Sequence, residues 1–350
     1  MQSNGQSNAY SRRFVLASTA AALAAGTVVR RPARAAAPLR IRVGWVVVPA
    51  DLFPLIPTMP HVTKHHGTSY VIEAQHFAGT TPMITAMASG EIDTGALAFS
   101  SMALAIQNAG LTDLKIIADS FEDGVEGYHT NTYLVRKDSP IRKVEDLKGK
   151  VLATNTIGSA VDIAMRVMLR KHGLNDKTDV SIVEAQFPVM KSMLNDDKVV
   201  LMPAVLPFSA DPELQQISRP LFTQKDAIGQ TQMIIHNARA DFIKKNHAAV
   251  VDMLEDLLRV QHYLMDPQHH EEAVKIVAEA TKQPPARFDK WLFTKDDYYR
   301  NPKGLPNLAA LQENFRIQRE LGYLKIDIDA KAYTDLGPVE AAAKRITTKA

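Results

Sequence analysis

The stretch Ala153–Met165, ATNTIGSAVDIAM, joins a short apolar strand to a helical pattern through a small, hydroxyl-rich turn, Thr154–Ser159. The first backbone N–H groups of a helix have no partner inside the helix, so such a turn can bind an anion. A phosphate loop needs a glycine-rich run that ends in Gly-Lys-Ser or Gly-Lys-Thr, or else the Gly-x-Gly-x-x-Gly pattern. The turn has only Gly158 and no lysine. The sequence therefore favours a cradle for another anion, or a capped helix with no ligand, over a nucleotide site.

Strand–helix–strand units of this kind repeat along the chain. The predicted strands before the stretch lie at 39–48, 70–77, 92–98, 115–119 and 131–136, with helices at 82–90 and 102–108. The second series starts at 151 and continues with helices at 159–172 and 188–195 and strands at 180–184 and 198–202. After a strand at 232–236 the pattern becomes helical, with helices predicted at 239–265, 269–281, 285–293 and 307–322. The alternation predicts an α/β fold of two domains whose sheets are flanked by helices.

The first 36 residues have the pattern of an export signal peptide. Arg12 and Arg13 precede the apolar run Phe14–Val29, and small residues offer a cleavage site near Ala35 or Ala36. The run is short and rich in alanine, whereas a membrane span needs about 20 strongly apolar residues. The start resembles a twin-arginine signal but departs from it at two positions. We therefore expect a periplasmic protein exported by the twin-arginine or the general secretion route; an uncleaved anchor helix is the alternative.

Composition excludes several classes of function. The chain has 41 Lys and Arg against 38 Asp and Glu, a formal net charge of +3. Five of the arginines, and no lysine or acidic residue, fall in 1–36, so the rest has 36 basic against 38 acidic residues, a charge of −2. This balance shows no basic bias that would suggest nucleic acid as a partner. The chain has no cysteine, which excludes disulfides, thiolate metal sites and cysteine nucleophiles.

Several segments resemble one family of transport proteins. The first is the glycine turn Phe77–Pro82, followed by the helix end Ala86–Asp93 with its Ala-x-Gly-x-x-Asp pattern. The others are Val144–Lys150 and the helix start Asp241–Asn246. In order and spacing these segments resemble the periplasmic solute-binding proteins of ABC importers, in particular the nitrate, sulfonate and taurine group. The resemblance covers roughly residues 39–325.

The resemblance implies a two-lobed periplasmic binding protein fold of type II. Each lobe is expected to be a mixed sheet flanked by helices, with the ligand cleft at the hinge. Lobe one would combine 38–135 with 236–345, and lobe two would span about 140–232. The two crossings near 135–140 and 232–236 would form the hinge, which closes around the ligand.

Ligand-binding groups are then expected on loops at strand ends and helix starts. Hydroxyl groups occur at three such helix starts, where an anion gains about 0.3–1 kcal/mol from each helix dipole. Any one of these Ser or Thr residues can instead be an N-cap without a ligand, and Trp45 can instead belong to the core. We expect the ligand-binding residues to be Trp45, Asp51, Phe53, Gly79, Thr80, Thr81, Phe99, Ser100, Ser101, Tyr128, Asn131, Thr154, Thr156, Gly158, Ser159, Leu206 and Thr231.

Charged candidates are fewer. Arg136 and Arg166 are candidates for an ionic clamp, but Arg166 falls in the middle of a predicted helix, where we expect it to be solvated. The pairs His65-His66 and His269-His270 could suggest a metal, yet adjacent residues of a helix point apart, and we expect no metal site. Apolar candidates without an obvious arginine favour an organic anion with an apolar body over nitrate.

The sequence thus predicts the substrate-binding component of an ABC importer. We expect it to capture a sulfonate, a taurine-like anion or an aromatic carboxylate, and to deliver this ligand to a membrane permease. We expect a monomer without a cofactor, and no enzymatic activity. The alternatives are an enzyme on the same fold, such as a pyrimidine-precursor synthase, and a ligand-sensing domain. The synthase family depends on a cysteine-rich segment, which this chain lacks, and the Gly-x-Ser-x-Gly pattern of serine hydrolases does not occur.

Overall fold

The structure, a computed structural model, describes residues 37–347, so the predicted export signal at 1–36 lies outside the described residues. The strands are β1 (Leu39–Trp45), β2 (Tyr70–His76), β3 (Thr94–Ala98), β4 (Leu114–Asp123), β5 (Thr132–Arg136), β6 (Val151–Thr154), β7 (Ser181–Glu184), β8 (Met202–Ala204), β9 (Ser218–Thr223) and β10 (Thr231–Arg239). The α-helices are α1 (Thr80–Ala88), α2 (Phe99–Asn108), α3 (Ala160–Lys171), α4 (Phe187–Asn195), α5 (Pro212–Ile217), α6 (Gln224–Ile228), α7 (Ala240–Lys245), α8 (His247–Met265), α9 (His270–Thr281), α10 (Leu308–Glu320) and α11 (Gly337–Thr347). Short 3-10 helices lie at Phe53–Thr58, Val144–Leu147, Phe208–Ala210, Pro267–His269, Pro285–Arg287 and Ala330–Tyr333.

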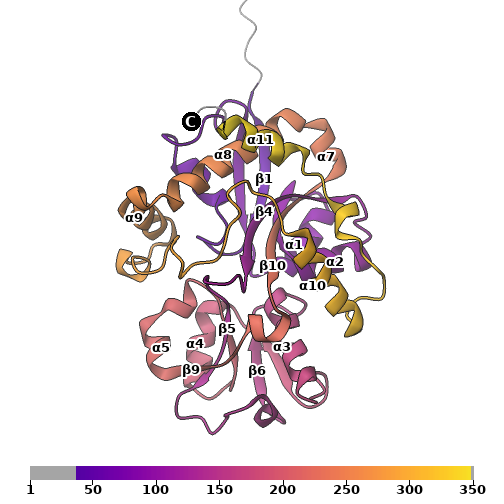
Figure 1. Cartoon of the computed structure of the whole chain (residues 1–350), viewed down its shortest axis with the longest axis vertical. Helices are drawn as coiled ribbons and strands as arrows, with labels where there is room; N and C mark the ends of the chain where they lie inside the picture. The colour runs from indigo at the N-terminus through magenta and orange to yellow at the C-terminus, as the bar shows by residue number, and fades with distance from the viewer. Residues whose placement is uncertain (1–36, 348–350) are drawn as a thin grey trace, which may run out of the picture. The chain divides into compact units, whose positions relative to one another are not determined.

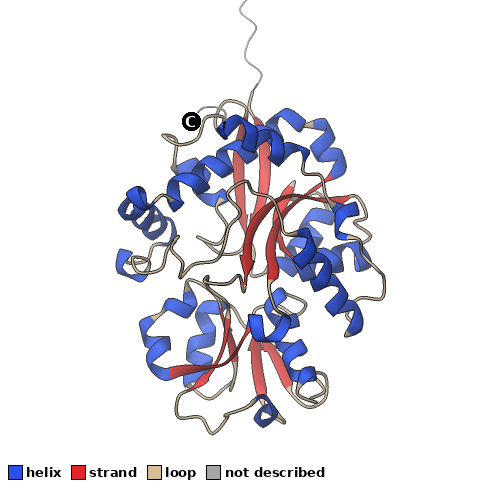
Figure 2. Ribbon diagram, in the orientation of Figure 1, coloured by secondary structure: helices blue, strands red, loops and turns tan. Residues whose placement is uncertain are grey.

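Five strands form the larger sheet, in the order β2-β1-β3-β10-β4 (Figure 1). β1 is parallel to β2 and β3, whereas β10 is antiparallel to both of its neighbours, so the sheet is mixed. Helices α1 and α2 pack on β3, and α10 packs on β10. Helix α8 packs on β2, and α11 packs on α8 and β4. Figure 2 shows these helices around the strands of the sheet.

The remaining strands form the second half of the described chain. An antiparallel sheet has the order β8-β5-β9, and β6 pairs with β7 in parallel. A single bridge between Leu152 and Leu201 links the two sets of strands. Helix α4 packs on β5 and β8, α5 and α6 pack on β9, and α3 packs on α6. Both halves are therefore sheets flanked by helices, which confirms the predicted two-lobed α/β fold.

The chain crosses between the two halves twice. It leaves the larger sheet at Asp123, where β4 ends, and enters the second half at Thr132. It returns after α6, at the start of β10. The crossing segments are thus 124–131 and 229–230. The predicted crossing at 232–236 lies inside the paired strand β10. The predicted crossing at 135–140 starts in the last two residues of β5 and continues into a turn of the second half.

Two helix predictions need correction. The helix expected at 285–293 is only the 3-10 turn Pro285–Arg287, since two prolines start it and Phe293 has a φ of 55°. The helix expected at 239–265 is divided at Asn246 into α7 and α8. The sequence reading also missed β9, α5, α6 and α11, which are short or lack a clear apolar period.

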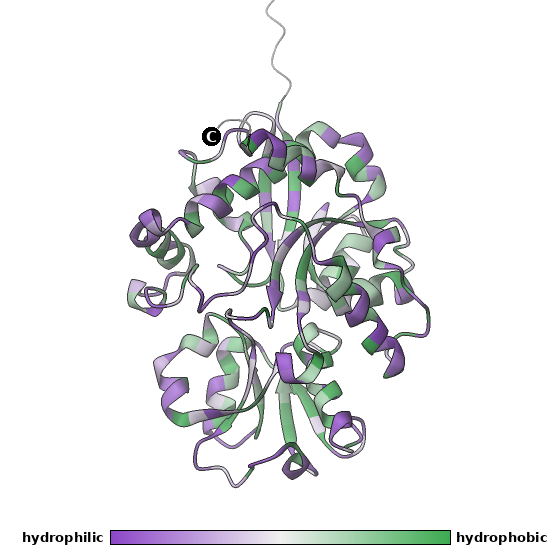
Figure 3. Cartoon of the chain, in the orientation of Figure 1, coloured by the Kyte–Doolittle hydropathy of each residue, from purple (hydrophilic) through white to green (hydrophobic). Residues whose placement is uncertain are grey.

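The core of each half is made by its buried strands and the inner faces of its helices. All of β3 is buried, and α8 has eleven buried residues, including Val250, Leu254 and Leu258. Figure 3 shows hydrophobic residues along the inner strands and a mixture of both kinds on the covering helices. Among the described helices, none has the length and apolar character that crossing a membrane requires.

Candidate functional site

A cavity of about 70 Å³ lies where the carboxyl ends of strands from both halves meet. Ligands of open α/β folds bind at this end of the strands, because the loops there are free to carry polar groups. One wall is formed by residues of β3, β4 and β10 and by the segments after β1 and β2, and the other by the segments after β6, β7 and β8. The lining residues are Val46, Val47, Ala50, Asp51, Thr80, Ala96, Ala98, Phe121, Asn155, Ser159, Ala160, Val161, Phe187, Val205, Leu206, Met233, Ile234 and Tyr298. We call this space the inner cavity.

Asp51 is the acidic side chain of the first wall. Its carboxylate Oδ2 accepts hydrogen bonds from the backbone N–H groups of Val46 (2.9 Å) and Val47 (3.2 Å), which folds the loop after β1 back on itself. Its other oxygen, Oδ1, is buried and has no hydrogen-bond partner among residues 37–347. Burial raises the pKa of Asp51 to about 6, against the opposing effects of these two N–H groups and of Arg300.

The turn before α3 forms the second wall. Ser159 is the N-cap of α3: its hydroxyl oxygen accepts the N–H of Asp162, and its hydroxyl donates to Asn155 Oδ1 at 2.8 Å. Gly158 has a φ of 82°, a left-handed conformation that favours glycine, and its N–H donates to Asp162 Oδ2 at 2.9 Å. Ala160 and Val161 line the cavity at the first helical positions, where N–H groups have no partner inside the helix. The stretch is therefore both a capped helix and a wall of the cavity.

The two walls touch each other beside the inner cavity. A Cβ atom at Gly79 would overlap Thr156 Oγ1 and lie 2.9 Å from Asn155 Nδ2, so the backbone before α1 approaches the opposite turn closely. Ser100 donates its hydroxyl to the carbonyl of Gly158 at 2.8 Å. The hydroxyl groups of Thr80 and Ser101 form a hydrogen bond of 2.7 Å. The hydroxyl group of Ser100 therefore joins the two walls, whereas those of Thr80 and Ser101 join α1 to α2 in this conformation.

Tyr298 connects three parts of the chain at the cavity. Its hydroxyl donates to Asn131 Oδ1 at 2.6 Å, in the segment where the chain crosses to the second half. The same oxygen accepts the backbone N–H of Leu206 at 3.1 Å. Its ring stacks on Phe121 of β4, with ring centroids 4.3 Å apart. No sequence pattern pointed to this residue, because it lies in a turn-rich segment without periodicity.

The structure brings four of the predicted site residues into the lining: Asp51, Thr80, Ser159 and Leu206. A second group lies in or beside the contacts between the walls, namely Gly79, Thr81, Ser100, Ser101, Thr156 and Gly158. The others lie away from the lining, buried or in neighbouring loops: Phe53, Phe99, Tyr128, Asn131, Thr154 and Thr231. The lining residues that sequence reasoning missed as ligand contacts are chiefly apolar, such as Val161, Phe187 and Met233, and apolar residues at strand ends look like core residues.

A wider groove adjoins the inner cavity. It has a volume of about 460 Å³ and shares Val46, Val47 and Phe187 with the inner cavity. Trp45 lines this groove, and its indole Nε1–H is buried without a hydrogen-bond partner in the described chain. The groove offers space for the part of a ligand that the inner cavity cannot hold.

Neither predicted arginine clamp reaches the inner cavity. Arg136 pairs with Asp138 at 2.5 Å and with Asp197 at 3.1 Å. Arg166 is not solvated as expected: its side chain is only 12% exposed, and it pairs with Asp162 at 2.9 Å and Asp176 at 3.0 Å. Its place on the buried side of α3 explains the error. Among the described residues, those that line the inner cavity include no Lys, Arg or His.

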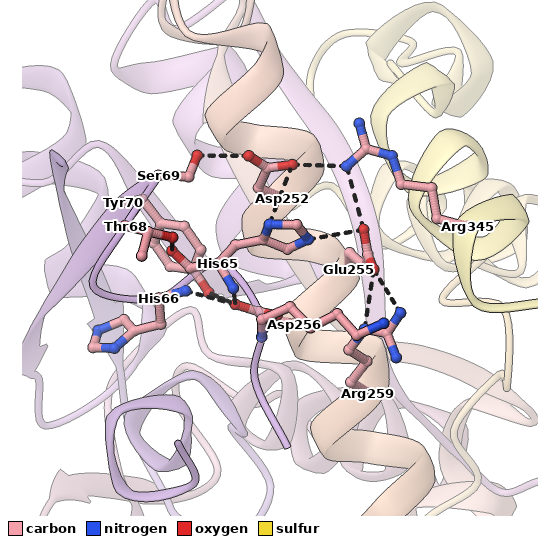
Figure 4. A network of polar contacts seen from close by, with 11 residues as sticks. His65, His66, Thr68, Ser69, Tyr70, Asp252, Glu255, Asp256, Arg259 and Arg345 are labelled. Atoms are coloured by element: carbon pink, nitrogen blue, oxygen red, sulfur yellow. Dashed lines mark hydrogen bonds and ion pairs between the residues drawn. The ribbon is translucent and has the colours of Figure 1, made fainter. Parts of the chain in front are cut away.

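A cluster of side chains of the kinds that bind metals lies outside the inner cavity, where the loop before β2 meets α8 (Figure 4). Ligand atoms of His65, Asp252 and Glu255 lie within 4.8 Å of one another. Arg345 contacts Asp252 at 2.7 Å and Glu255 at 3.2 Å, and Arg259 contacts Glu255 at 2.6 Å. Burial alone would raise the pKa of Glu255, but hydrogen bonds from Arg259, His65 and Arg345 lower it to about 2. The arginines supply the positive charge that a metal would bring, so the cluster fastens α11 and the loop before β2 to α8.

The other histidines of the predicted pairs have separate partners. His66 Nε2 accepts the backbone N–H of Ile72 at 3.3 Å. His269 stacks on Tyr263 with centroids 3.8 Å apart. His270 Nε2 lies 2.8 Å from the carbonyl oxygen of Asp289. The members of each pair therefore do not share a ligand position.

Comparison with solved structures identifies relatives of the fold. The aliphatic sulphonate-binding protein SsuA from Escherichia coli is 19% identical, with a TM-score of 0.65, over 85% of this chain and 97% of its own. The nitrate-binding protein NrtA from Synechocystis PCC 6803 is 15% identical, with a TM-score of 0.68, over 88% of this chain and 89% of its own. The desulfurization enzyme DSZB is 12% identical, with a TM-score of 0.64, over 88% of this chain and 99% of its own. At these identities the likeness shows a shared fold.

Comparison of the sequence gives the family. No curated protein matches the chain significantly. The model of the NMT1-like family matches residues 35–278, which is more than half of the chain. The protein therefore belongs to the NMT1-like family and has the two-lobed fold of periplasmic binding proteins.

Proposed function

We propose that this protein is the periplasmic substrate-binding component of an ABC importer. It captures a small organic anion between its two halves and delivers the anion to the membrane permease. The crossing segments 124–131 and 229–230 act as the hinge, and they divide the chain into one lobe of 37–123 plus 231–347 and a second lobe of 132–228. The protein works as a monomer, and the export signal at 1–36 brings it to the periplasm.

The proposal rests on the position of the inner cavity between the two halves and on its small volume. Both halves supply its walls, and the contacts between Ser100 and Gly158 and between Gly79 and Thr156 bring these walls together. A cavity of about 70 Å³ has room for only a few water molecules, so a ligand enters only when the walls separate. Hinge opening and closure around a solute is the motion that such a two-lobed arrangement permits.

An enzyme is the second candidate function, because the desulfurization enzyme DSZB has the same fold. Fold alone does not decide between binding and turnover, since unrelated functions occur on one scaffold. In the described conformation the hydroxyl groups of Thr80 and Ser159 are bonded to other side chains rather than to a general base. We therefore favour binding. Recovery of an unchanged ligand from the protein after long incubation, measured by mass spectrometry, separates the two functions.

Ligand-induced closure is the direct test of the proposal. The chain has no native cysteine, so cysteines introduced at Lys177 and Lys244, which are exposed and lie in opposite halves, give two clean labelling sites for fluorescence transfer. We expect that a sulfonate or carboxylate that stabilises the protein in a thermal-shift screen also raises the transfer efficiency. A matched pair of labels within one half, at Lys244 and Thr85, controls for effects on the dyes. Stabilisation without a change in transfer between the halves would contradict hinge closure.

A further inference from the structure

The buried carboxylate of Asp51 needs a hydrogen-bond donor, which a ligand that is only an anion would not supply. Asp51 is 4% exposed, lines the cavity, and keeps Oδ1 without a partner in the described part of the chain. The hydroxyl groups of Thr80, Ser159 and Tyr298, which line the same cavity, each have protein partners. A buried carboxylate oxygen without a donor is unfavourable, because it has lost its water without replacement. Asp51, a residue of the cavity wall, thus keeps one strong acceptor atom without a donor.

The protein does not supply the missing donor from the nearest cation. Arg300 is 1% exposed and lies beneath the loop that carries Asp51. Its guanidinium donates to the carbonyl of Pro49 at 3.2 Å and lies 3.4 Å from Asp297 Oδ2. It therefore supports the loop through Pro49 and pairs with another acid, while no Lys, Arg or His of the described chain lines the cavity itself. The donor for Asp51 Oδ1 is left to the ligand.

The opposite wall offers groups of the other polarity. The side-chain oxygen of Asn155 is occupied by Ser159, which leaves its Nδ2–H₂ group as a donor beside the cavity. Ala160 and Val161 present the first N–H groups of α3 on the same wall, where the helix dipole favours negative charge. One wall thus accepts hydrogen bonds and the other donates them, with apolar residues such as Val47, Phe187 and Met233 also lining the space.

We infer that the ligand is an amine-bearing organic acid, whose N–H group donates to Asp51 Oδ1 while its acidic group lies at the start of α3. This inference rests on the proposed function, because it assumes that the inner cavity and the adjoining groove receive the solute. A bare inorganic anion, or an alkyl acid without a nitrogen, leaves Asp51 unpaired and adds a second negative charge beside it. Such ligands are therefore disfavoured relative to their amino derivatives.

Matched pairs of probes test the inference by isothermal titration calorimetry. Each pair differs only in the amine: 2-aminoethanesulfonate with ethanesulfonate, 4-aminobutyrate with butyrate, and 4-(aminomethyl)benzoate with 4-methylbenzoate. In the wild-type protein we expect the amine of at least one pair to bind more tightly than its partner by about tenfold or more, as for a hydrogen bond between charged groups. Asp51→Asn keeps an acceptor for Val46 and Val47 but replaces the free oxygen by a donor, so it should abolish this preference. Asp197→Asn, a change at an exposed carboxylate outside the cavity, should leave it intact.

The outcomes separate this inference from the proposed function. If the unsubstituted acids bind as tightly as the amines, or if Asp51→Asn leaves the amine preference unchanged, the inference is wrong while the proposed function stands. If Asp51 instead donates a proton to an anion, the unsubstituted acid binds more tightly at pH 5 than at pH 8, which also overturns it. If Asp51→Asn does not fold, the amine preference of the wild-type protein decides alone. If no probe binds or closes the labelled protein at millimolar concentration, both proposals fail.

Discussion

Asp51 and its neighbours show how burial sets the chemistry of a single side chain. The sequence marks Asp51 only as an acid in a loop after a strand, which is an ordinary place for a solvated carboxylate. The fold removes its water, gives Oδ2 two backbone donors, and leaves the buried Oδ1 without a donor in the described chain. The raised pKa of about 6 follows from the missing solvation, since the two N–H groups compensate only part of it.

The raised pKa of Asp51 predicts a pH-dependent effect of Asp51→Asn on the unliganded protein. The folded pKa of about 6 exceeds the ordinary value of 3.8, so the folded state takes up protons between these values and loses stability as the pH rises through them. The Asp51→Asn variant has no titrating carboxylate at this position, so it does not lose this stability as the pH rises. We expect its free energy of unfolding, relative to wild type, to rise by about 2 kcal/mol between pH 4 and pH 7. Urea denaturation of both proteins at several pH values measures this difference.

Elements decide which of the predicted hydroxyl groups are available to a ligand. The starts of α1, α2 and α3 do carry the Ser and Thr residues that the sequence suggested. However, Ser159 caps α3, and Ser100 reaches across to the carbonyl of Gly158. Residues at helix starts have the same sequence signature whether they cap, bind a ligand or join two helices. Only the spatial relation of α2 to the turn before α3 tells these roles apart.

Gly79, at the start of α1, provides a test of the contact between elements. In Gly79→Ala, the added methyl group would overlap Thr156 Oγ1 in the described conformation, although the backbone of Gly79 is extended and accepts any residue. We expect the two halves to remain folded while ligand affinity falls by roughly fivefold to a hundredfold, the effect of overpacking by one methyl group. Calorimetry with a stabilising ligand measures the loss. Thr85→Ala, on an exposed turn of the same helix, is the control, and equal affinities of the two variants would show that the contact does not matter for binding.

At the scale of the whole molecule, three distant segments meet at one tyrosine. Residue 298 belongs to the C-terminal segment, residue 131 to the first crossing and residue 206 to the second half, and one hydroxyl group joins them. Asp123 adds to the same region by accepting the backbone N–H of Asn131 at 2.8 Å, at the point where the chain leaves the larger sheet. The relation between the halves thus depends on a few buried hydrogen bonds as well as on the crossing segments.

Tyr298→Phe tests this link between the halves. The substitution keeps the ring on Phe121 but leaves Asn131 Oδ1 and the N–H of Leu206 unpaired, so we expect a loss of about 1–3 kcal/mol in the free energy of unfolding. The labelled protein should also close less completely with ligand. Tyr263→Phe, which removes an exposed hydroxyl bonded to Glu272, should cost less than about 0.5 kcal/mol. Similar stability of both variants would mean that the buried hydroxyl contributes little.

The sequence by itself determined the class of this fold. Alternating strands and helices, short turns and apolar periods are local properties, so they predicted an α/β fold of two domains and nine of the ten described strands, although the segment predicted for β8 shares only Met202 with it. The two-lobed plan came from the resemblance to solute-binding proteins. The prediction that the loops after β1, β2 and β6 carry ligand-binding residues rests on the same kind of local signal, a strand end followed by polar residues.

Tertiary structure alone decided what the site is made of. The crossing points depend on which strands pair, and strand pairing is a relation between distant residues. The role of Tyr298 depends on Asn131 and Leu206, which are 167 and 92 residues away in the chain. The burial of Arg166 and the unpaired oxygen of Asp51 likewise depend on what the fold packs around them. The physical reason is that solvation, charge pairing and hydrogen bonding are set by whatever surrounds a group in space, whereas a sequence pattern reports only its neighbours along the chain.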